Sequence, residues 1–373
     1  MHVPFANPSR AYFTNRENVL RIFDDVLGRG DLIDRSDLKQ FETELSNYLN
    51  IEFAIGVSSG YHALYLSLLA IKLSPGDIVA LPAHTHISTC SAVIHAGGEP
   101  ILIDSGNDFN ICINDLERQC EKYKVKVIIP VHMNGLMCKM VEIKSIADNF
   151  GSIIIEDACQ SIGAKYSSIP AGGWGLLGCF SFFPFKILGG YGDGGAISTS
   201  NTYLMKTLKE LRYNGEDRMS KIYHHHGCSC LLDNIQAAIL KFKLTKINEY
   251  LSKRKIIAYK YNESFKDIPE IEIPILIDKR TDHVYQNYVI RSKFRDKLKN
   301  FLTENSIESM IHWQYPYYNQ SELGLKKFQL TNLKTLTEEM LSLPIYPEMK
   351  VDEVHYVIDK VREFFKKIKN GNK

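Results

Sequence analysis

The middle of the chain alternates short apolar runs with longer stretches of helical periodicity. Within one such stretch Leu64, Leu68 and Ile71 recur at the spacing of a single helix face. Four apolar runs, each bounded by glycine, proline or aspartate, predict buried strands at 77–82, 99–104, 125–132 and 151–158. Strands that alternate with helices predict an α/β fold with a mostly parallel sheet covered on both faces. Ligands of such sheets bind at the carboxyl ends of the strands, here the loops after Val57, Leu81, Ile155 and Phe182.

The pattern changes after Asp233. A long amphipathic helical stretch follows, and its apolar stripe contains Ile235, Ala238, Ile239 and Phe242. An alternating, strand-like segment lies at 283–291, and a final helix rich in Lys and Phe begins at Asp352. These features predict a large domain of residues 1–245 and a smaller C-terminal α/β domain of residues 246–373.

Composition indicates a globular protein. The chain has 373 residues, of which 45% are apolar, enough for two domains with sizeable cores. Its net charge is only +2, so nucleic acid is not expected as a partner. The N-terminal residues lack the pattern of a signal peptide, and no run of about 18 apolar residues occurs. We therefore expect a cytoplasmic protein without a membrane partner. The eight cysteines include no C-x-x-C pair, which argues against zinc and thioredoxin-like sites.

A turn of small polar residues follows the apolar run that ends at Val57 and precedes a helix. Gly60 would let the backbone approach an anion, and free amide groups at the helix start would point toward it. Ser59 is also suited to be an ordinary helix N-cap, and the motif taken alone favours the cap.

Two consecutive acids, Glu156 and Asp157, close one of the predicted strands. Strand alternation sends one to each face of the sheet. A carboxylate at the end of a buried strand needs a cation or several hydrogen-bond donors. Such a group can hold a proton on a heterocyclic nitrogen or cap the next helix. Gln160 lies one helical turn later and could reach the same ligand.

Lys186 lies between the aromatic residues of 182–185 and a loop, 189–195, that contains five glycines. Desolvation disfavours a charged amine and lowers its pKa. Only the neutral amine attacks a carbonyl. A surface lysine needs neither neighbour, so the two neighbours favour a functional lysine over one that extends into solvent.

A fourth segment, 223–240, places three adjacent histidines and two cysteines before a helix whose predicted cap is Asp233. Adjacent residues rarely converge on one ion, so polar loop contacts are favoured over a metal site. The other three segments supply an anion cup, a strand-end aspartate and a pocket lysine. Together these are what pyridoxal 5'-phosphate requires, for its phosphate, its ring nitrogen and its aldehyde. No single element is specific, but their joint presence and order predict this cofactor.

Six motifs resemble the successive motifs of the nucleotide-sugar aminotransferases of the DegT/StrS type. They are GVSSGYHAL, ALPAHTHIST, EDACQSIGA, SFFPFKILGGYGDGGA, LLDNIQAAIL and LSLPIYPEM. The resemblance covers essentially the whole chain. It implies the aspartate aminotransferase-like fold (pyridoxal-phosphate fold type I) and a homodimer in which each active site lies at the subunit interface.

The resemblance also implies residue roles. Lys186 would be the catalytic lysine that attaches the cofactor, Asp157 would bind the pyridine nitrogen, and Gln160 would contact the ring hydroxyl. The remaining cofactor contacts would be Ser59, Gly60, Tyr61, His86, Ser181 and Ser229. The substrate would meet Tyr191, His225, His312 and Tyr318. No metal is expected.

Several positions depart from the family pattern. Ser229 and Leu231 replace an asparagine and an arginine, and the asparagine would reach the phosphate of the neighbouring subunit. Tyr61 and His62 replace threonine and aspartate, His86 replaces an aromatic residue, and Tyr318 replaces a histidine. The resemblance still implies the same fold and cofactor despite these changes, but the identity of the sugar becomes less defined.

The loop after the lysine bears on the substrate. Because Lys186 is retained, transamination is favoured over the dehydration that relatives with histidine there perform. Residues 191–196 resemble members that aminate carbon 3. The expected reaction transfers an amino group from L-glutamate to a dTDP-3-keto-6-deoxyhexose, for a surface polysaccharide such as lipopolysaccharide O-antigen, or for another glycan. A UDP-linked 3-keto sugar, a 4-keto sugar and a non-catalytic regulator that binds the cofactor are the alternatives.

Overall fold

The protein is built on a seven-stranded sheet with strand order β1-β9-β8-β5-β4-β2-β3. The computed structural model describes residues 1–274, 278–325 and 328–371. The sheet strands are β1 Phe53–Val57, β2 Ile78–Pro82, β3 Glu99–Ile103, β4 Val125–Ile128, β5 Ile153–Asp157, β8 Leu177–Ser181 and β9 Gly195–Thr199. β9 runs antiparallel to both of its neighbours, and the other pairs are parallel. The predicted α/β fold with a mostly parallel sheet is confirmed.

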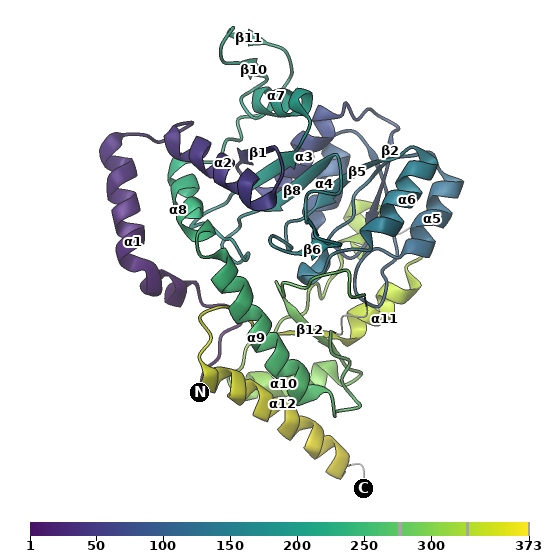
Figure 1. The fold of residues 1–373 in the computed structure, drawn as a ribbon. Helices are drawn as coiled ribbons and strands as arrows, with labels where there is room; N and C mark the ends of the chain where they lie inside the picture. The colour runs from purple at the N-terminus through teal and green to yellow at the C-terminus, as the bar shows by residue number, and fades with distance from the viewer. Residues whose placement is uncertain (275–277, 326–327, 372–373) are drawn as a thin grey trace.

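Helices cover both faces of this sheet (Figure 1). One face packs against α3 Gly60–Ala70, α4 Ile87–His95 and α7 Thr202–Leu211. The other packs against α2 Ser36–Leu49, α5 Ile113–Lys122, α6 Met140–Phe150 and α8 Asn234–Leu244. Strand alternation divides the side chains between the two layers, with Ile155 in the first and Ile154 in the second.

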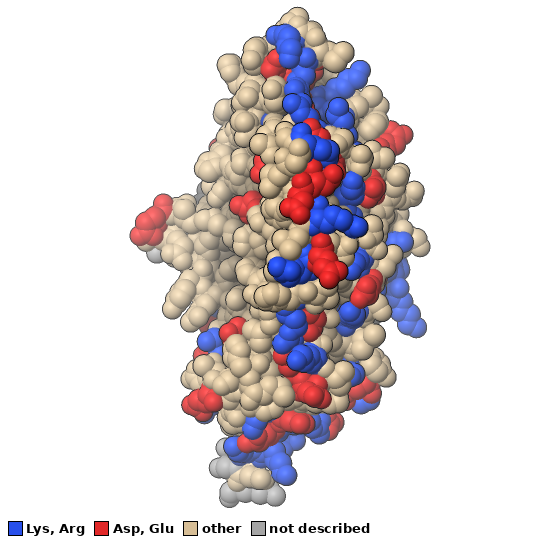
Figure 2. Space-filling model, turned by 90° about the vertical axis from the view of Figure 1, so that its left-hand side faces the viewer, with Lys and Arg blue, Asp and Glu red and all other residues tan. Residues whose placement is uncertain are grey.

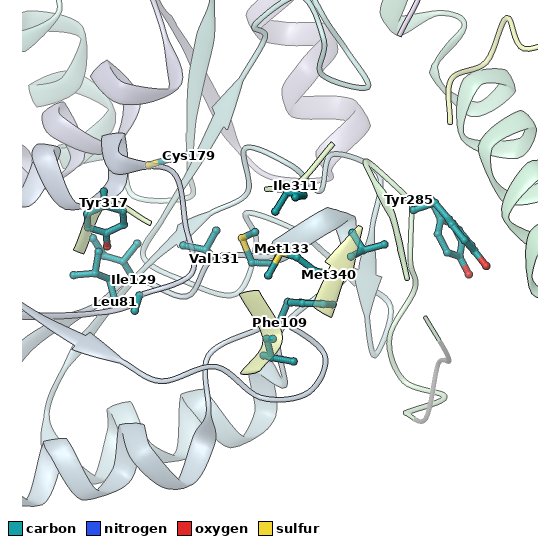
Figure 3. Packing of buried hydrophobic residues seen from close by; sticks show 14 of the residues in the cluster. Leu81, Phe109, Ile129, Val131, Met133, Cys179, Tyr285, Ile311, Tyr317 and Met340 are labelled. Carbon is teal, nitrogen blue, oxygen red and sulfur yellow. The ribbon is translucent and has the colours of Figure 1, made fainter. Parts of the chain in front are cut away.

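The C-terminal part is a second α/β assembly. It contains α9 Ile247–Phe265, β12 Tyr288–Arg291, α10 Arg295–Glu304, α11 Thr331–Glu339, β13 Met340–Leu343 and α12 Val351–Gly371. β12 and β13 pair antiparallel, and Val3 near the N-terminus pairs with Ile307. The sheet and the C-terminal part share a hydrophobic core. Leu81 and Val131, at the end of the sheet, belong to one cluster with Ile311 and Met340 (Figure 3).

One long helix and several short elements complete the chain. They are α1 Pro8–Arg29, the hairpins β6 Lys165–Tyr166 with β7 Ile169–Pro170 and β10 Glu216–Asp217 with β11 Ile222–Tyr223, and the 3-10 turns Met133–Gly135, Tyr317–Asn319 and Ser321–Leu323. The β10–β11 hairpin projects from the top of the molecule in Figure 1. On the face seen in Figure 2, Lys and Arg side chains alternate with Asp and Glu side chains, in keeping with the near-neutral composition.

Three predicted elements have different bounds. The strand predicted at 125–132 ends at Ile128, Pro130 has no amide hydrogen to donate, and beyond it Val131 forms only an isolated parallel bridge with Asp157. The strand predicted at 283–291 is a strand only from Tyr288, because Tyr285 has a φ of +52°. The long helix after Asp233 is two helices, separated at Lys246 by non-helical φ and ψ of −106° and 0°. The proposed domain boundary at 245/246 coincides with this break, and the domain division itself stays a prediction.

Candidate active site

A cavity of about 670 Å³ lies where the carboxyl ends of the central strands meet the C-terminal part. Its walls come from the ends of β5 and β8, from the first turns of α3 and α4, and from the 308–313 segment. Nine of the predicted site residues line it: Ser59, Gly60, Tyr61, His86, Asp157, Gln160, Ser181, Lys186 and His312.

The turn at the start of α3 is both a helix cap and a close-packed surface. The Ser59 side chain accepts a hydrogen bond from the amide of His62 at 3.1 Å, so the N-cap interpretation is correct. A Cβ at Gly60 would stand 2.8 Å from the Ser181 Cβ and 2.9 Å from the Cys159 sulfur, so a side chain does not fit. The first amides of a helix have no acceptor within the helix. This turn therefore combines free N–H groups with the close backbone approach that a phosphate needs.

Asp157 ends β5 inside the cavity. Its carboxylate accepts hydrogen bonds from the Thr89 hydroxyl at 2.9 Å and from the Cys159 amide at 3.2 Å, and the residue is only 4% exposed. Thr89 lies on α4, and the sequence analysis did not identify it. Its hydroxyl fixes the orientation of the carboxylate, which leaves an anionic group on the cavity floor.

The neighbouring acid, Glu156, is directed to the opposite face. It is fully buried and accepts amide hydrogens from Gly172, Trp174 and Gly175 at 3.0, 2.6 and 2.8 Å. Its Oε2 also lies 2.9 Å from His132 Nε2. Glu156 is thus a structural acid that holds the 172–175 loop, and Asp157 is the acid in the cavity.

The buried hydrogen bonds of Glu156 predict that Glu156→Gln lowers the stability of the fold. A glutamine offers one acceptor oxygen, and its NH2 group would face backbone N–H groups that then lose their partner. We expect the free energy of unfolding to fall by about 3 kcal/mol. Urea unfolding followed by circular dichroism measures this difference. Unchanged stability would show that the carboxylate does not hold the loop.

Lys186 lies in the irregular segment between β8 and β9. Burial lowers the pKa of its amine, and the nearby Cys159 thiol and Asp157 carboxylate oppose this effect. The aromatic wall expected before it is only partly formed. Phe182 is fully buried against Phe41, whereas Phe183 and Phe185 are 45% and 52% exposed at the cavity edge. The lysine is therefore desolvated by the cavity as a whole more than by the residues that precede it.

Two imidazoles and an indole form another wall of the cavity. Burial and the Lys186 charge lower the pKa of His86, and Asp157 opposes them. His312 bonds to the Ser342 hydroxyl at 2.9 Å, and burial together with Lys186 lowers its pKa to about 4. His312 is consequently neutral at pH 7. Trp313 lies with its ring centre 6.0 Å from that of His86. This tryptophan is not among the residues predicted from the sequence.

A hydrogen bond to a neighbouring loop holds the side chain of Gln160 in place. Its side-chain oxygen accepts the amide hydrogen of Asn134 at 2.9 Å. Asn134 is in turn bonded by the side chain of Asn287 at 3.0 Å. The side chain of Gln160 is thereby held at the cavity wall, in the non-helical turns that follow Asp157.

Four predicted residues do not line the cavity of the single chain. Tyr191 packs beside Tyr12 and under Lys243, whose Nζ is 4.2 Å from the ring centre. His225 lies 3.1 Å from Glu210. Ser229 forms an isolated antiparallel β-bridge with Tyr213. Tyr318 lines a neighbouring aromatic pocket of about 240 Å³ that shares His86 and Trp313 with the cavity. Their roles stay predictions.

The histidine segment shows no metal-ligand geometry. Within residues 1–274, 278–325 and 328–371, no group of three or more His, Cys, Asp or Glu side chains is placed to hold an ion. Asp233 stands at the N-cap of α8 as predicted, but its side chain makes no capping hydrogen bond.

The cavity fits pyridoxal 5'-phosphate. A cradle that a Cβ would fill at Gly60, a buried carboxylate at Asp157 and a desolvated amine at Lys186 supply the three groups that this cofactor needs. The DegT/DnrJ/EryC1/StrS aminotransferase family model matches residues 14–362. The chain belongs to this family. The predicted resemblance, the enzyme class and the cofactor are thereby confirmed, and the protein is a pyridoxal-phosphate-dependent sugar aminotransferase.

Characterised relatives match over nearly the whole chain. The "Pleiotropic regulatory protein" of Geobacillus stearothermophilus is 34% identical over 98% of this chain and 99% of its own length. The dTDP-3-amino-3,4,6-trideoxy-alpha-D-glucose transaminase of Micromonospora megalomicea is 31% identical over 94% and 96%. The UDP-N-acetyl-3-dehydro-alpha-D-glucosamine 3-aminotransferase of Acidithiobacillus ferrooxidans is 31% identical over 95% of each chain.

Solved structures agree with the fold. DesV of S. venezuelae superposes with a TM-score of 0.93 at 30% identity and covers 98% of each chain. NtdA of Bacillus subtilis, solved with bound cofactor PMP, superposes with a TM-score of 0.91 at 29% identity, covering 98% of this chain and 85% of its own. In the described part of this chain, no helix combines the length and apolar character needed to cross a membrane.

Proposed function

We propose that this aminotransferase moves the amino group of L-glutamate to carbon 3 of a dTDP-linked 3-keto-6-deoxyhexose. The product is a dTDP-3-amino-3,6-dideoxyhexose. The observation that supports transamination is the pairing, in one cavity, of the Lys186 amine, whose pKa burial lowers, with the buried carboxylate of Asp157. The choice of carbon 3 rests on the resemblance of 191–196 and on the relatives named for 3-amino sugars.

Different residues would bind the cofactor phosphate, keep the ring nitrogen protonated and move the proton. When bound, pyridoxal phosphate supplies a carbon that accepts the amino group and a ring that takes up electrons. The amide groups of the 59–61 turn bind the phosphate. The carboxylate of Asp157, oriented by Thr89, holds a proton on the ring nitrogen. Nζ of Lys186 would remove the proton from the alpha carbon of glutamate in the first half of the reaction and deliver a proton to carbon 3 of the sugar in the second half.

The nucleotide and the carbon are tested with a panel of acceptors. The purified holoenzyme is incubated with glutamate and, separately, with dTDP-3-keto-6-deoxyhexose, a UDP-linked 3-keto sugar and a dTDP-4-keto-6-deoxyhexose. We expect the first to give the highest kcat/KM, measured by 2-oxoglutarate release. A higher value for the UDP sugar overturns the nucleotide assignment, and a higher value for the 4-keto sugar overturns carbon 3.

A non-catalytic regulator that binds the cofactor is the second candidate, because one relative carries the name "Pleiotropic regulatory protein". The complete set of Lys186, Asp157 and Gln160 in the cavity argues against it. Absence of 2-oxoglutarate release with every acceptor, in a protein that still binds pyridoxal phosphate, would favour the regulator.

We further propose a cytoplasmic homodimer whose product enters a surface polysaccharide. Ser229 stands where the resemblance implies a residue that reaches the phosphate of the neighbouring subunit, and it follows in sequence the β10–β11 hairpin that projects in Figure 1. Light scattering of the holoenzyme tests the dimer. A monomer at micromolar concentration would contradict it.

A further inference from the structure

The segment that carries Lys186 has no strand partner. It lies between β8, which ends at Ser181, and β9, which begins at Gly195. Within it, the amide of Lys186 donates to the carbonyl of Phe183 at 2.8 Å, which closes only a local turn. The Phe182 amide donates to the Gly194 carbonyl and the Gly190 amide donates to the Phe182 carbonyl, which closes the loop, and side chains from elsewhere in the fold contact the residues next to the lysine.

One side chain from the C-terminal part contacts the backbone on both sides of the lysine. The side-chain NH2 group of Gln286 donates to the carbonyl of Phe185 at 2.9 Å. Its side-chain oxygen accepts the amide hydrogen of Ile187 at 3.0 Å. The partners fix which end of the amide is which, because a carbonyl needs a donor and an N–H group needs an acceptor.

Gln286 is itself held firmly. The buried guanidinium of Arg254 donates to the carbonyls of Tyr285 and Gln286 at 3.0 and 3.3 Å. The next residue, Asn287, bonds to Asn134 through its side chain at 3.0 Å. The amide of Gln286 thus extends from a fixed backbone to the edge of the cavity, which it helps to line.

The rest of the loop is held by a different element. On α8, the Gln236 side-chain oxygen accepts the amide hydrogen of Tyr191 at 2.9 Å, and Lys243 Nζ donates to the Gly189 carbonyl at 2.6 Å. These contacts lie three or more residues beyond the lysine. Gln286 is the side chain that acts at the lysine itself.

We propose that Gln286 is a positioning residue for Lys186, whose side-chain amide brackets the lysine backbone and so fixes where Nζ stands in the cavity. The inference rests on the proposed function in one respect, that Lys186 is the lysine that moves the proton. Proton transfer depends steeply on the placement of the base, and a misplacement of about 1 Å can cost roughly 100-fold in rate. Gln286 therefore acts on the reaction through the lysine, without touching the reacting atoms.

Three variants test this. Gln286→Leu removes both hydrogen bonds. Gln286→Glu keeps the acceptor for Ile187 but can donate to Phe185 only when its carboxyl group is protonated. The matched control is Gln119→Leu on α5, where a half-buried glutamine donates to Asp115 at 3.2 Å, far along the sheet from the cavity.

The first measurement is the half-reaction with glutamate alone, followed by the visible absorbance of the cofactor attached to Lys186. For Gln286→Leu we expect the saturated rate to fall by roughly 10- to 100-fold, with the half-saturating glutamate concentration changed less than about threefold. Without glutamate, the pH at which this absorbance changes should shift by roughly half a unit, or about threefold in the protonation equilibrium. Gln119→Leu should show neither effect.

The second measurement is the pH profile of Gln286→Glu. Its rate relative to the wild type should rise as pH falls from about 8 to about 5, because protonation restores the donor that Phe185 needs. A merely structural glutamine would give a constant ratio.

Other outcomes overturn the proposal. They are an unchanged rate and absorbance profile in Gln286→Leu, or a lower melting temperature as its only effect. If Gln286→Leu does not fold, a flat ratio for Gln286→Glu overturns the proposal by itself. A wild type that attaches the cofactor but aminates no ketosugar would refute the proposed function, and the absorbance titration would still decide the role of Gln286.

Discussion

Lys186→Ala is expected to lower the turnover number by about 10³-fold or more, because one amine both attaches the cofactor and moves the proton in each half of the reaction. Folding should be preserved, since within the described part of the chain the amine forms no salt bridge and its burial is unfavourable to its charge. The variant should still bind pyridoxal phosphate through the 59–61 turn and Asp157. Turnover is measured as 2-oxoglutarate release over many cycles.

The control for this variant is Lys297→Ala, an exposed lysine on α10. It should match the wild type in rate and in melting temperature. Multiple turnover in Lys186→Ala at a rate near that of the wild type would contradict the assignment of the lysine.

Asp157→Asn is expected to lower kcat by roughly 100-fold while changing stability little. The asparagine keeps the shape of the side chain and can still accept the Thr89 hydrogen bond, but it loses the charge that holds a proton on the ring nitrogen. The electron uptake by the ring then weakens. Stopped-flow absorbance of the glutamate half-reaction measures the rate, and thermal unfolding measures the stability.

Two further variants separate the effect of the Asp157 charge from other effects of a substitution. Asp148→Asn, at an exposed position that pairs with Lys144, should leave the rate unchanged. Glu156→Gln should show the reverse pattern, with lower stability and a smaller effect on the rate of the folded enzyme. An Asp157→Asn enzyme with wild-type kinetics would show that this carboxylate does not serve the ring nitrogen.

The parts of the site that local sequence determines could be predicted. Gly60 is required by a close approach at a helix start, and alternation at the end of a buried strand sends Glu156 and Asp157 to opposite faces, with the choice of Asp157 implied by the family resemblance. Lys186 is marked by its apolar and glycine-rich neighbours. In each case the chemistry depends on residues adjacent in the chain, so the sequence pattern contains it.

The contacts that orient these groups could not be predicted from pattern. Thr89 meets Asp157 across 68 positions, and Gln286 meets Ile187 across 99. Neither residue type is unusual where it stands, and only the folded chain brings the partners together. The strand bounds at 283–291 failed for a similar reason, because Tyr285 takes a left-handed conformation within a segment whose bonds go to distant loops.

The aromatic residues before Lys186 are also buried differently from what the sequence predicts. Its composition predicted an apolar wall, but in this irregular segment Phe182 is buried whereas Phe183 and Phe185 are largely exposed. The burial that lowers the pKa of Lys186 comes from the cavity as a whole, whose wall also includes His86 and His312 from other elements. The neighbours of Lys186 in sequence therefore account for only part of its burial.

Transfer of labelled nitrogen tests the central claim most directly. The holoenzyme is supplied with glutamate carrying a nitrogen isotope label and with dTDP-3-keto-6-deoxyhexose, and the sugar product is analysed by mass spectrometry and NMR. We predict that the label appears at carbon 3 of the sugar in the wild-type reaction and is absent with Lys186→Ala. Label in no sugar, or equal labelling with both proteins, would contradict the account.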